Sequence, residues 1–215
     1  MFSLPVSLLV ALSSILSVVG DKPSNRTLHY IFKPLTMLIL IIGALSVGVV
    51  QHAFVYWLLL GLCLSLIGDV FLMLPSDRFI QGLASFLLAH IAYVVAFSQL
   101  YDGNVTYAWL AGVMVFSGLF FALLAKDLGK LKGPVLIYIL AISSMVWLSG
   151  ELYFQQQSFT HLLLMAGAIT FAISDASLAW NKFKQPFHWA QWLILLTYFG
   201  AQWLLVQAML SFTSY

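Results

Sequence analysis

Two aspartates, Asp69 and Asp175, lie inside apolar stretches that are long enough to cross a lipid bilayer. An ionised carboxylate inside lipid is costly, so such residues usually line a cavity, a pathway or a site. Their settings match, because each ends a stretch that starts with a glycine eight positions earlier, GLCLSLIGD (61–69) and GAITFAISD (167–175). Paired carboxyl groups suit proton transfer, either in an enzyme or in a proton-coupled transporter, and both classes stay open from these residues alone.

Small and polar residues accompany the aspartates on helical faces. Ser65 precedes Asp69 by one turn, and the next apolar run, QGLASFLLAHIAY (81–93), places His90 and Tyr93 about one turn apart. Small residues let helices approach closely, so these faces are expected to point at neighbouring helices and not at lipid. The alternative interpretation is that the faces only pack, with each polar group satisfied by a hydrogen bond.

Composition decides the fold class. The 215 residues are 62% hydrophobic and only 7% charged, whereas a soluble domain carries about 25% charged residues. In lipid the backbone must satisfy its own polar groups, which leaves helices or a closed barrel. The apolar runs are continuous and near the roughly 20 residues of a spanning helix, without the alternation of barrel strands. We therefore predict an all-α, polytopic transmembrane bundle.

The apolar runs divide the chain into about eight spans with short connections, forming one integral-membrane domain over residues 1–215. The first run lacks the basic start of a signal peptide, so it is expected to be a span. The predicted spans are 2–19, 31–50, 54–74, 79–100, 107–125, 134–150, 161–180 and 188–211.

The nine basic residues predict the orientation. They fall at the first, third, fifth and seventh connections and at neither terminus: Lys22, Arg26 and Lys33; Arg78; Lys126, Lys130 and Lys132; Lys182 and Lys184. Under the positive-inside rule these connections are cytoplasmic and both termini lie on the non-cytoplasmic side. The net charge of +2 is thus a matter of topology and of contacts with lipid headgroups, and no nucleic-acid partner is expected.

The two aspartates are predicted to share a depth. Each lies about five residues before the cytoplasmic end of its span, which places it roughly 8 Å inside that boundary. One cavity open to the cytoplasmic leaflet could then contain both. Their separation of 106 residues is close to half the chain, which hints at a parallel internal repeat of four spans.

The remaining histidines carry less information. His29, His52, His161 and His188 fall at span ends, where interfacial water is expected to solvate them. No cluster of histidine and acidic residues has the spacing of metal ligands. We predict no metal site and no cofactor.

Taken together, the motifs resemble the YhhN-like, or lysoplasmalogenase, family over nearly the whole chain. The resemblance lies in Lys33-Pro34-Leu35, GLCLSLIGDVFLML (61–74), GLASFLLAHIAYVVAF (82–97), the spacing of Pro134, Tyr138 and Met145, and GAITFAISDASLAW (167–180). It implies a membrane hydrolase that cleaves the vinyl-ether bond of lysoplasmalogens. The products would be a fatty aldehyde and glycerophosphoethanolamine or glycerophosphocholine. The expected location is the bacterial inner membrane, with membrane lipids around the protein.

The resemblance also implies a site, in which Asp69 and Asp175 are the catalytic pair. The predicted substrate-binding residues are Lys33, Ser65, His90, Tyr93, Tyr138 and Ser174. Vinyl ethers hydrolyse by protonation of an alkene carbon, giving an oxocarbenium ion that water captures. One aspartic acid could donate the proton and the other, ionised, could stabilise the cation, as two carboxyls do in glycoside hydrolysis. Which aspartate takes which role stays open at this point.

Two other classes remain as alternatives. A transporter would also suit eight spans with buried acids, although no pair of Gly/Pro-broken helices occurs at mid-membrane. A lipid-binding protein without catalysis is the second. An intramembrane aspartyl protease is disfavoured, because residues 66–69 read Leu-Ile-Gly-Asp in place of the motif GxGD.

Overall fold

The structure is a computed structural model that describes residues 2–20, 26–46, 52–74 and 78–212. Within these ranges the chain forms helices and no strands, so the predicted all-α bundle of eight helices is confirmed. The helices are α1 (Leu4–Val19), α2 (Arg26–Ser46), α3 (Ala53–Met73), α4 (Phe79–Ser98), α5 (Tyr107–Leu124), α6 (Lys132–Gln156), α7 (Phe159–Phe183) and α8 (Ala190–Phe212), with a short 3-10 helix η1 (Gly129–Leu131) before α6.

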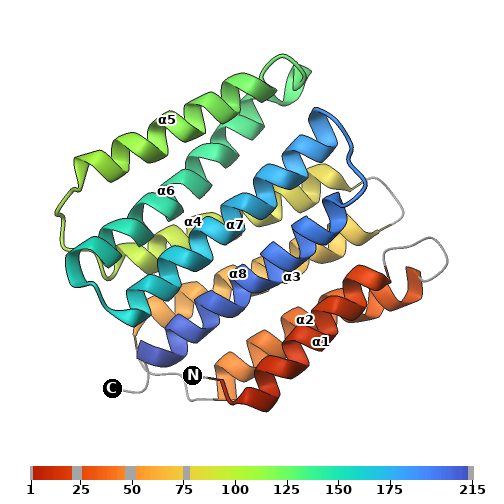
Figure 1. Ribbon diagram of the computed structural model, residues 1–215, viewed down its shortest axis with the longest axis horizontal. Coiled ribbons are helices and arrows are strands. Elements are labelled where there is room, and N and C mark those ends of the chain that lie inside the picture. Colours follow the sequence, from red (N-terminus) through yellow and green to blue (C-terminus); the bar gives the residue numbers. More distant parts are fainter. Residues whose placement is uncertain (1, 21–25, 47–51, 75–77, 213–215) are drawn as a thin grey trace.

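Seven of these helices, α2 to α8, are long and apolar enough to cross a membrane. Helix α1 is apolar but has only 16 residues, fewer than the roughly 20 that a spanning helix needs. It lies along α2 at the edge of the bundle (Figure 1). The eight helices therefore match the predicted runs, and the first is the shortest.

The helices run alternately up and down, so that the two ends of the described chain lie at the same end of the bundle (Figure 1). The opposite end holds the connections after α5 and α7. We call it the basic end, because it carries Arg26, Lys126, Lys130, Lys132, Lys182 and Lys184; Lys22 lies outside the described residues. The structure shows this asymmetry of charge, and which end is cytoplasmic stays a prediction.

The packing of the first four helices is repeated in the last four. The hairpins α3–α4 and α7–α8 are the most closely packed pairs, and α2 contacts α3 as α6 contacts α7. Across the halves, α8 packs on α2 and α4 packs on α6. Helices α1 and α5 occupy opposite edges (Figure 1). This pattern is the one that a parallel repeat of four helices predicts.

Small residues allow the close approach of α3 and α4, as the sequence predicted. A methyl group on Gly61 would meet the ring of Tyr93, and one on Gly68 would meet the ring of Phe86. These aromatic rings occupy the space that the absent side chains leave, and both are buried. The glycines thereby bring the helix that carries Asp69 against the helix that carries His90.

Candidate active site

A polar cavity of about 510 Å³ lies toward the basic end, between α2, α3, α7 and α8. Both Asp69 and Asp175 line it, so the prediction that one cavity contains the two carboxyl groups is confirmed. The cavity extends to the exposed side chains of Arg26 and Lys182. Its other polar lining residues are His29, Tyr30, Lys33, Ser174, Asn181, Gln191 and Tyr198.

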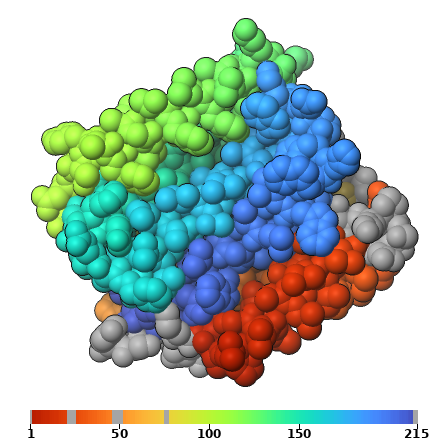
Figure 2. Space-filling view, in the orientation of Figure 1, coloured from red at the N-terminus to blue at the C-terminus, as the bar shows by residue number. Residues whose placement is uncertain are grey.

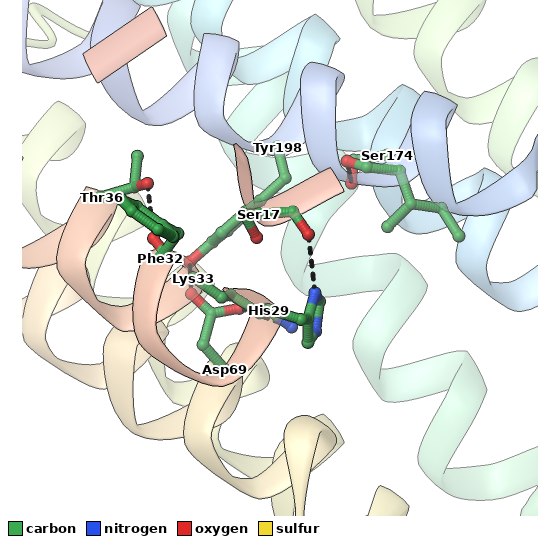
Figure 3. A network of polar contacts seen from close by, with 9 residues as sticks. Ser17, His29, Phe32, Lys33, Thr36, Asp69, Ser174 and Tyr198 are labelled. Atoms are coloured by element: carbon green, nitrogen blue, oxygen red, sulfur yellow. Dashed lines mark hydrogen bonds and ion pairs between the residues drawn. The ribbon is translucent and has the colours of Figure 1, made fainter. Parts of the chain in front are cut away.

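Asp69 lies about one turn before the end of α3 and is 1% exposed. The Lys33 Nζ atom lies 3.2 Å from Asp69 Oδ1, and the Tyr198 hydroxyl donates a hydrogen bond of 2.6 Å to Asp69 Oδ2. The three side chains point toward one another from α2, α3 and α8 (Figure 3). Both oxygens of this carboxylate are therefore engaged by donors, one of them a cation.

The sequence analysis predicted Lys33 at the first connection, where its span begins. The structure instead places Lys33 inside α2. Helix α2 begins at Arg26 and continues through Pro34, so Lys33 lies two turns inside the helix. Its side chain is buried at 6% exposure. The prediction failed because the polar residues within 26–30 suggested a connection, whereas residues 26–30 form the first turns of α2 at the basic end.

Two histidines predicted at the interface are in fact buried. His29 lines the polar cavity, and its Nδ1 atom lies 3.0 Å from the carbonyl oxygen of Ser17 on α1 (Figure 3). His161 is buried at the other end of the bundle, with Nδ1 2.6 Å from Ser158 Oγ. The prediction was wrong for both, because neighbouring helices cover these span ends.

Asp175 lies on α7 with 12% of its side chain exposed. The Tyr138 hydroxyl, from α6, donates a hydrogen bond of 2.6 Å to Asp175 Oδ2, and His90 Nε2, from α4, lies 3.4 Å from the same oxygen. Among the described residues, Oδ1 of Asp175 makes no hydrogen bond or ion pair. Within the described part of the chain, Asp175 thus differs from Asp69 in having one engaged oxygen and no lysine beside it.

His90 is completely buried and its ring is held by aromatic neighbours. The ring centre lies 5.2 Å from that of Tyr138 and 4.7 Å from that of Phe171, both in edge-on arrangements. This packing fixes the imidazole with Nε2 toward Asp175. His90 is therefore a close neighbour of the carboxyl group, although neither ring nitrogen makes a hydrogen bond to a described residue, and it lines neither of the two cavities.

A second, apolar cavity meets the site at Asp175. It is a groove of about 1020 Å³ between α5, α6 and α7, and Asp175 and Tyr138 are part of its lining. Asp175 therefore faces both the polar cavity and this apolar groove. The site has two compartments of opposite chemical character, with one carboxyl group at their junction.

Comparison with known proteins agrees with this architecture. Residues 28–209 match the YhhN family. The chain belongs to the YhhN family. A membrane protein named YhhN from Escherichia coli O6:H1 is 28% identical over 93% of this chain and 96% of its own length.

Other relatives of this YhhN-family protein come from animals. Lysoplasmalogenase TMEM86B from Mus musculus is 31% identical over 94% of this chain and 83% of its own length. Lysoplasmalogenase TMEM86A from Homo sapiens is 35% identical over 67% of this chain and 61% of its own length. No solved structure matches the chain. The protein is thus a multi-pass membrane protein of the YhhN family.

The remaining predicted site residues of this YhhN-family chain lie in two places. One lines the polar cavity, and two lie deeper in the bundle. Ser174 lines the polar cavity, and its hydroxyl donates to the carbonyl oxygen of Ile194. Ser65 and Tyr93 line neither cavity; the Tyr93 hydroxyl donates to Gln202 Oε1 at 2.8 Å and lies 3.5 Å from Ser65 Oγ. These two therefore belong to a buried network one turn deeper than Asp69.

Tyr198 is the site residue that the sequence analysis missed. It is buried in the middle of α8 and contacts Asp69 directly. The polar residues Thr197, Tyr198 and Gln202 in the last apolar run could have indicated an inward face. The distance of 129 residues between Tyr198 and Asp69 hides their contact from any local pattern.

Proposed function

We propose that this protein is a membrane hydrolase that cleaves the vinyl-ether bond of lysoplasmalogens, releasing a fatty aldehyde and glycerophosphoethanolamine or glycerophosphocholine. Relatives named lysoplasmalogenase, at 31–35% identity, support the reaction class. The two carboxyl groups on one cavity support the site. With the basic end in the cytoplasm, as the positive-inside rule predicts, the substrate would come from the cytoplasmic leaflet of the inner membrane.

The asymmetry between the aspartates is the observation that carries the mechanism. Asp69 has donors on both oxygens, including the Lys33 ammonium, an arrangement that suits an ionised carboxylate. Among the residues that the structure describes, Asp175 has a hydrogen-bond donor on Oδ2 alone, which leaves Oδ1 to carry a proton. We assign Asp175 as the general acid and Asp69 as the stabilising anion and base.

In the first step, Asp175 Oδ1–H would transfer its proton to the alkene carbon that is not bonded to oxygen. The π electrons form the new C–H bond, and the adjacent carbon and ether oxygen share the positive charge as an oxocarbenium ion. The Asp69 carboxylate stabilises this cation, because a fixed anion in a low-dielectric site acts strongly on developing charge. Tyr138 donates to Oδ2, so it stabilises the Asp175 carboxylate that remains.

In the second step, water adds to the oxocarbenium carbon and its proton passes to Asp69. The resulting hemiacetal collapses as its hydroxyl proton moves to the glycerol oxygen and the C–O bond breaks. One aldehyde and one glycerophospho-alcohol leave for each water consumed. Transfer of a proton from Asp69 to Asp175, through water in the polar cavity, restores the starting state.

The test is aldehyde release from a lysoplasmenyl lipid by the purified protein, with Asp69→Asn and Asp175→Asn in parallel. Each variant is expected to lose about 10²–10⁴-fold in rate, the usual contribution of a positioned acid or base. Asp127→Asn is the matched control, because Asp127 is half-exposed and pairs with Lys184 at the basic end. Full activity of both site variants would refute the assignment. No release by the folded wild-type protein, with vectorial uptake into vesicles, would favour a transporter.

A further inference from the structure

The apolar groove between α5, α6 and α7 is larger than the polar cavity that holds Asp69. Figure 2 shows it as a depression between α5 and α7, with α6 at its floor. Its volume of about 1020 Å³ is at the upper end of the roughly 300–1,000 Å³ that is common for ligand sites. The side chains that line it along the bundle include Trp109, Val113 and Phe116 of α5, Ile142 and Val146 of α6, and Ala172 of α7.

Helix α5 is held so that this groove stays open. It packs on α6 and contacts it at three levels: Trp109 Nε1 donates to the Trp147 carbonyl oxygen at 3.1 Å, Ser117 and Ser143 hydroxyls lie 2.6 Å apart, and Leu124 is buried against Val135 and Ile139. Along most of its length α5 does not approach α7. In lipid no hydrophobic force closes such a gap, so the groove is available to a hydrocarbon chain.

Asp175 makes the groove continuous with the polar cavity, since it lines both. A molecule that reaches across this residue must be apolar on one side and polar on the other. The polar compartment carries Arg26, Lys33 and Lys182, whose positive charges suit a phosphate group. The two compartments together therefore have the chemical character of an amphiphile with one apolar chain.

We propose that the groove binds the single hydrocarbon chain of the lysolipid, with the headgroup in the polar cavity and the chain end directed toward Trp109. This inference rests on the proposed function and adds the basis of its preference for single-chain lipids. Of the two cavities that Asp175 lines, one is apolar, so it offers a place to one chain, and we expect a second chain on the glycerol to remain outside the site. From Tyr138 to Val146 the groove follows α6 for about 12 Å, at 1.5 Å per residue.

Two glycines of α5 offer a matched pair of variants. A side chain at Gly112 or at Gly118 would start in open space, so neither position forces a backbone movement. Gly112 lines the groove, whereas Gly118 does not. Gly112→Trp should fill the half of the groove near Trp109, away from Asp175. Gly118→Trp should add the same indole to the lipid-facing surface. Val113→Trp is a second blocking variant, in case Gly112→Trp does not fold.

The experiment uses an alkyl-ether lysophospholipid that carries a diazirine at the end of its chain. This probe has no vinyl ether, so its binding is independent of turnover. In the wild-type protein we expect photolabelling of groove residues near Trp109 and Val146, competed by unlabelled lysolipid. Gly112→Trp should reduce this labelling about tenfold, equivalent to ~1.4 kcal/mol, and Gly118→Trp should leave it unchanged. A diacyl probe should not label the groove above the level of the exposed helix surfaces.

The outcomes separate this inference from the proposed reaction. Groove labelling that depends on Gly112, without aldehyde release from any vinyl-ether lipid, would support the chain site and refute the hydrolase. Aldehyde release with labelling elsewhere, or with labelling insensitive to both Gly112→Trp and Val113→Trp, would keep the hydrolase and overturn the chain site. Equal groove labelling by the diacyl probe would also overturn it, since the groove would then hold ordinary bilayer lipid.

Discussion

Lys33 and Tyr138 contact the two aspartates from corresponding helices of the two halves of the chain. Lys33 Nζ on α2 lies 3.2 Å from Asp69 on α3, and the Tyr138 hydroxyl on α6 lies 2.6 Å from Asp175 on α7. The second contact of each aspartate comes from the other half of the chain. The Tyr198 hydroxyl of α8 donates to Asp69, and His90 Nε2 of α4 lies 3.4 Å from Asp175. The scaffold is thus repeated while the chemistry at its two aspartates has diverged, a lysine on one side and a histidine on the other.

The Lys33–Asp69 ion pair should be essential to both stability and turnover. Lys33→Met leaves a buried carboxylate uncompensated and is expected to lower the free energy of unfolding by about 3–5 kcal/mol. Aldehyde release should also fall, because Lys33 would no longer hold the Asp69 carboxylate where it stabilises the cation. Adding Asp69→Asn to Lys33→Met should restore much of the stability and none of the activity.

The control for this pair is Lys184→Met, which breaks the half-exposed contact of Lys184 with Asp127. It should change the free energy of unfolding by less than about 1 kcal/mol. Unfolding in mixed micelles measures both variants. Equal effects of Lys33→Met and Lys184→Met would contradict the role of the buried pair.

Removal of the Tyr138 hydroxyl should slow the reaction without unfolding the protein. Tyr138→Phe deletes the hydrogen bond to Asp175 Oδ2, which stabilises the carboxylate formed when the proton leaves. A hydrogen bond to a charged group contributes about 1.5–3 kcal/mol, so kcat should fall roughly ten- to hundredfold. Tyr93→Phe is the matched control, since its hydroxyl donates to Gln202 away from both cavities; it should cost stability and leave kcat nearly unchanged.

Glu151 should matter for stability alone. Its carboxylate is completely buried at the end opposite the site and accepts hydrogen bonds from the Thr106 backbone N–H and from Trp147 Nε1. Glu151→Gln replaces one acceptor oxygen by a donor and is expected to cost about 1–3 kcal/mol. Gln155→Ala, which removes an exposed hydrogen bond to Asn104, should cost less. A loss of kcat in Glu151→Gln at a temperature where it is folded would show that this end also acts in turnover.

The close approach of α3 and α4 should depend on Gly61. Gly61→Val would place methyl groups in the ring of Tyr93, and overpacking of this kind costs about 1–3 kcal/mol. Gly118→Val on α5 has open space around it and is the control. Thermal unfolding of the two variants should separate them clearly, and similar midpoints would indicate that the α3–α4 contact is looser than the structure shows.

The class of the fold and the two membrane-embedded carboxyl groups could be predicted from the amino-acid sequence alone. Long apolar runs in lipid can only be helices, and a carboxylate in such a run is so costly that it indicates a site wherever it occurs. For this reason the eight helices, Asp69 and Asp175 could be predicted without any knowledge of neighbours. The glycines of α3 could also be predicted as part of a packing face, because their spacing follows the helical turn and small residues let helices approach closely.

The difference between the two aspartates became visible only in the packing of the helices around them. The partners of Asp69 come from α2 and α8, and those of Asp175 come from α4 and α6; no local pattern specifies which helices meet. This packing also placed Lys33, a predicted substrate-binding residue, inside α2 and beside Asp69, and it added Tyr198 to the site. Protonation and charge at a buried carboxyl depend on the donors within hydrogen-bonding distance, and those donors are brought together by packing between helices far apart in the chain.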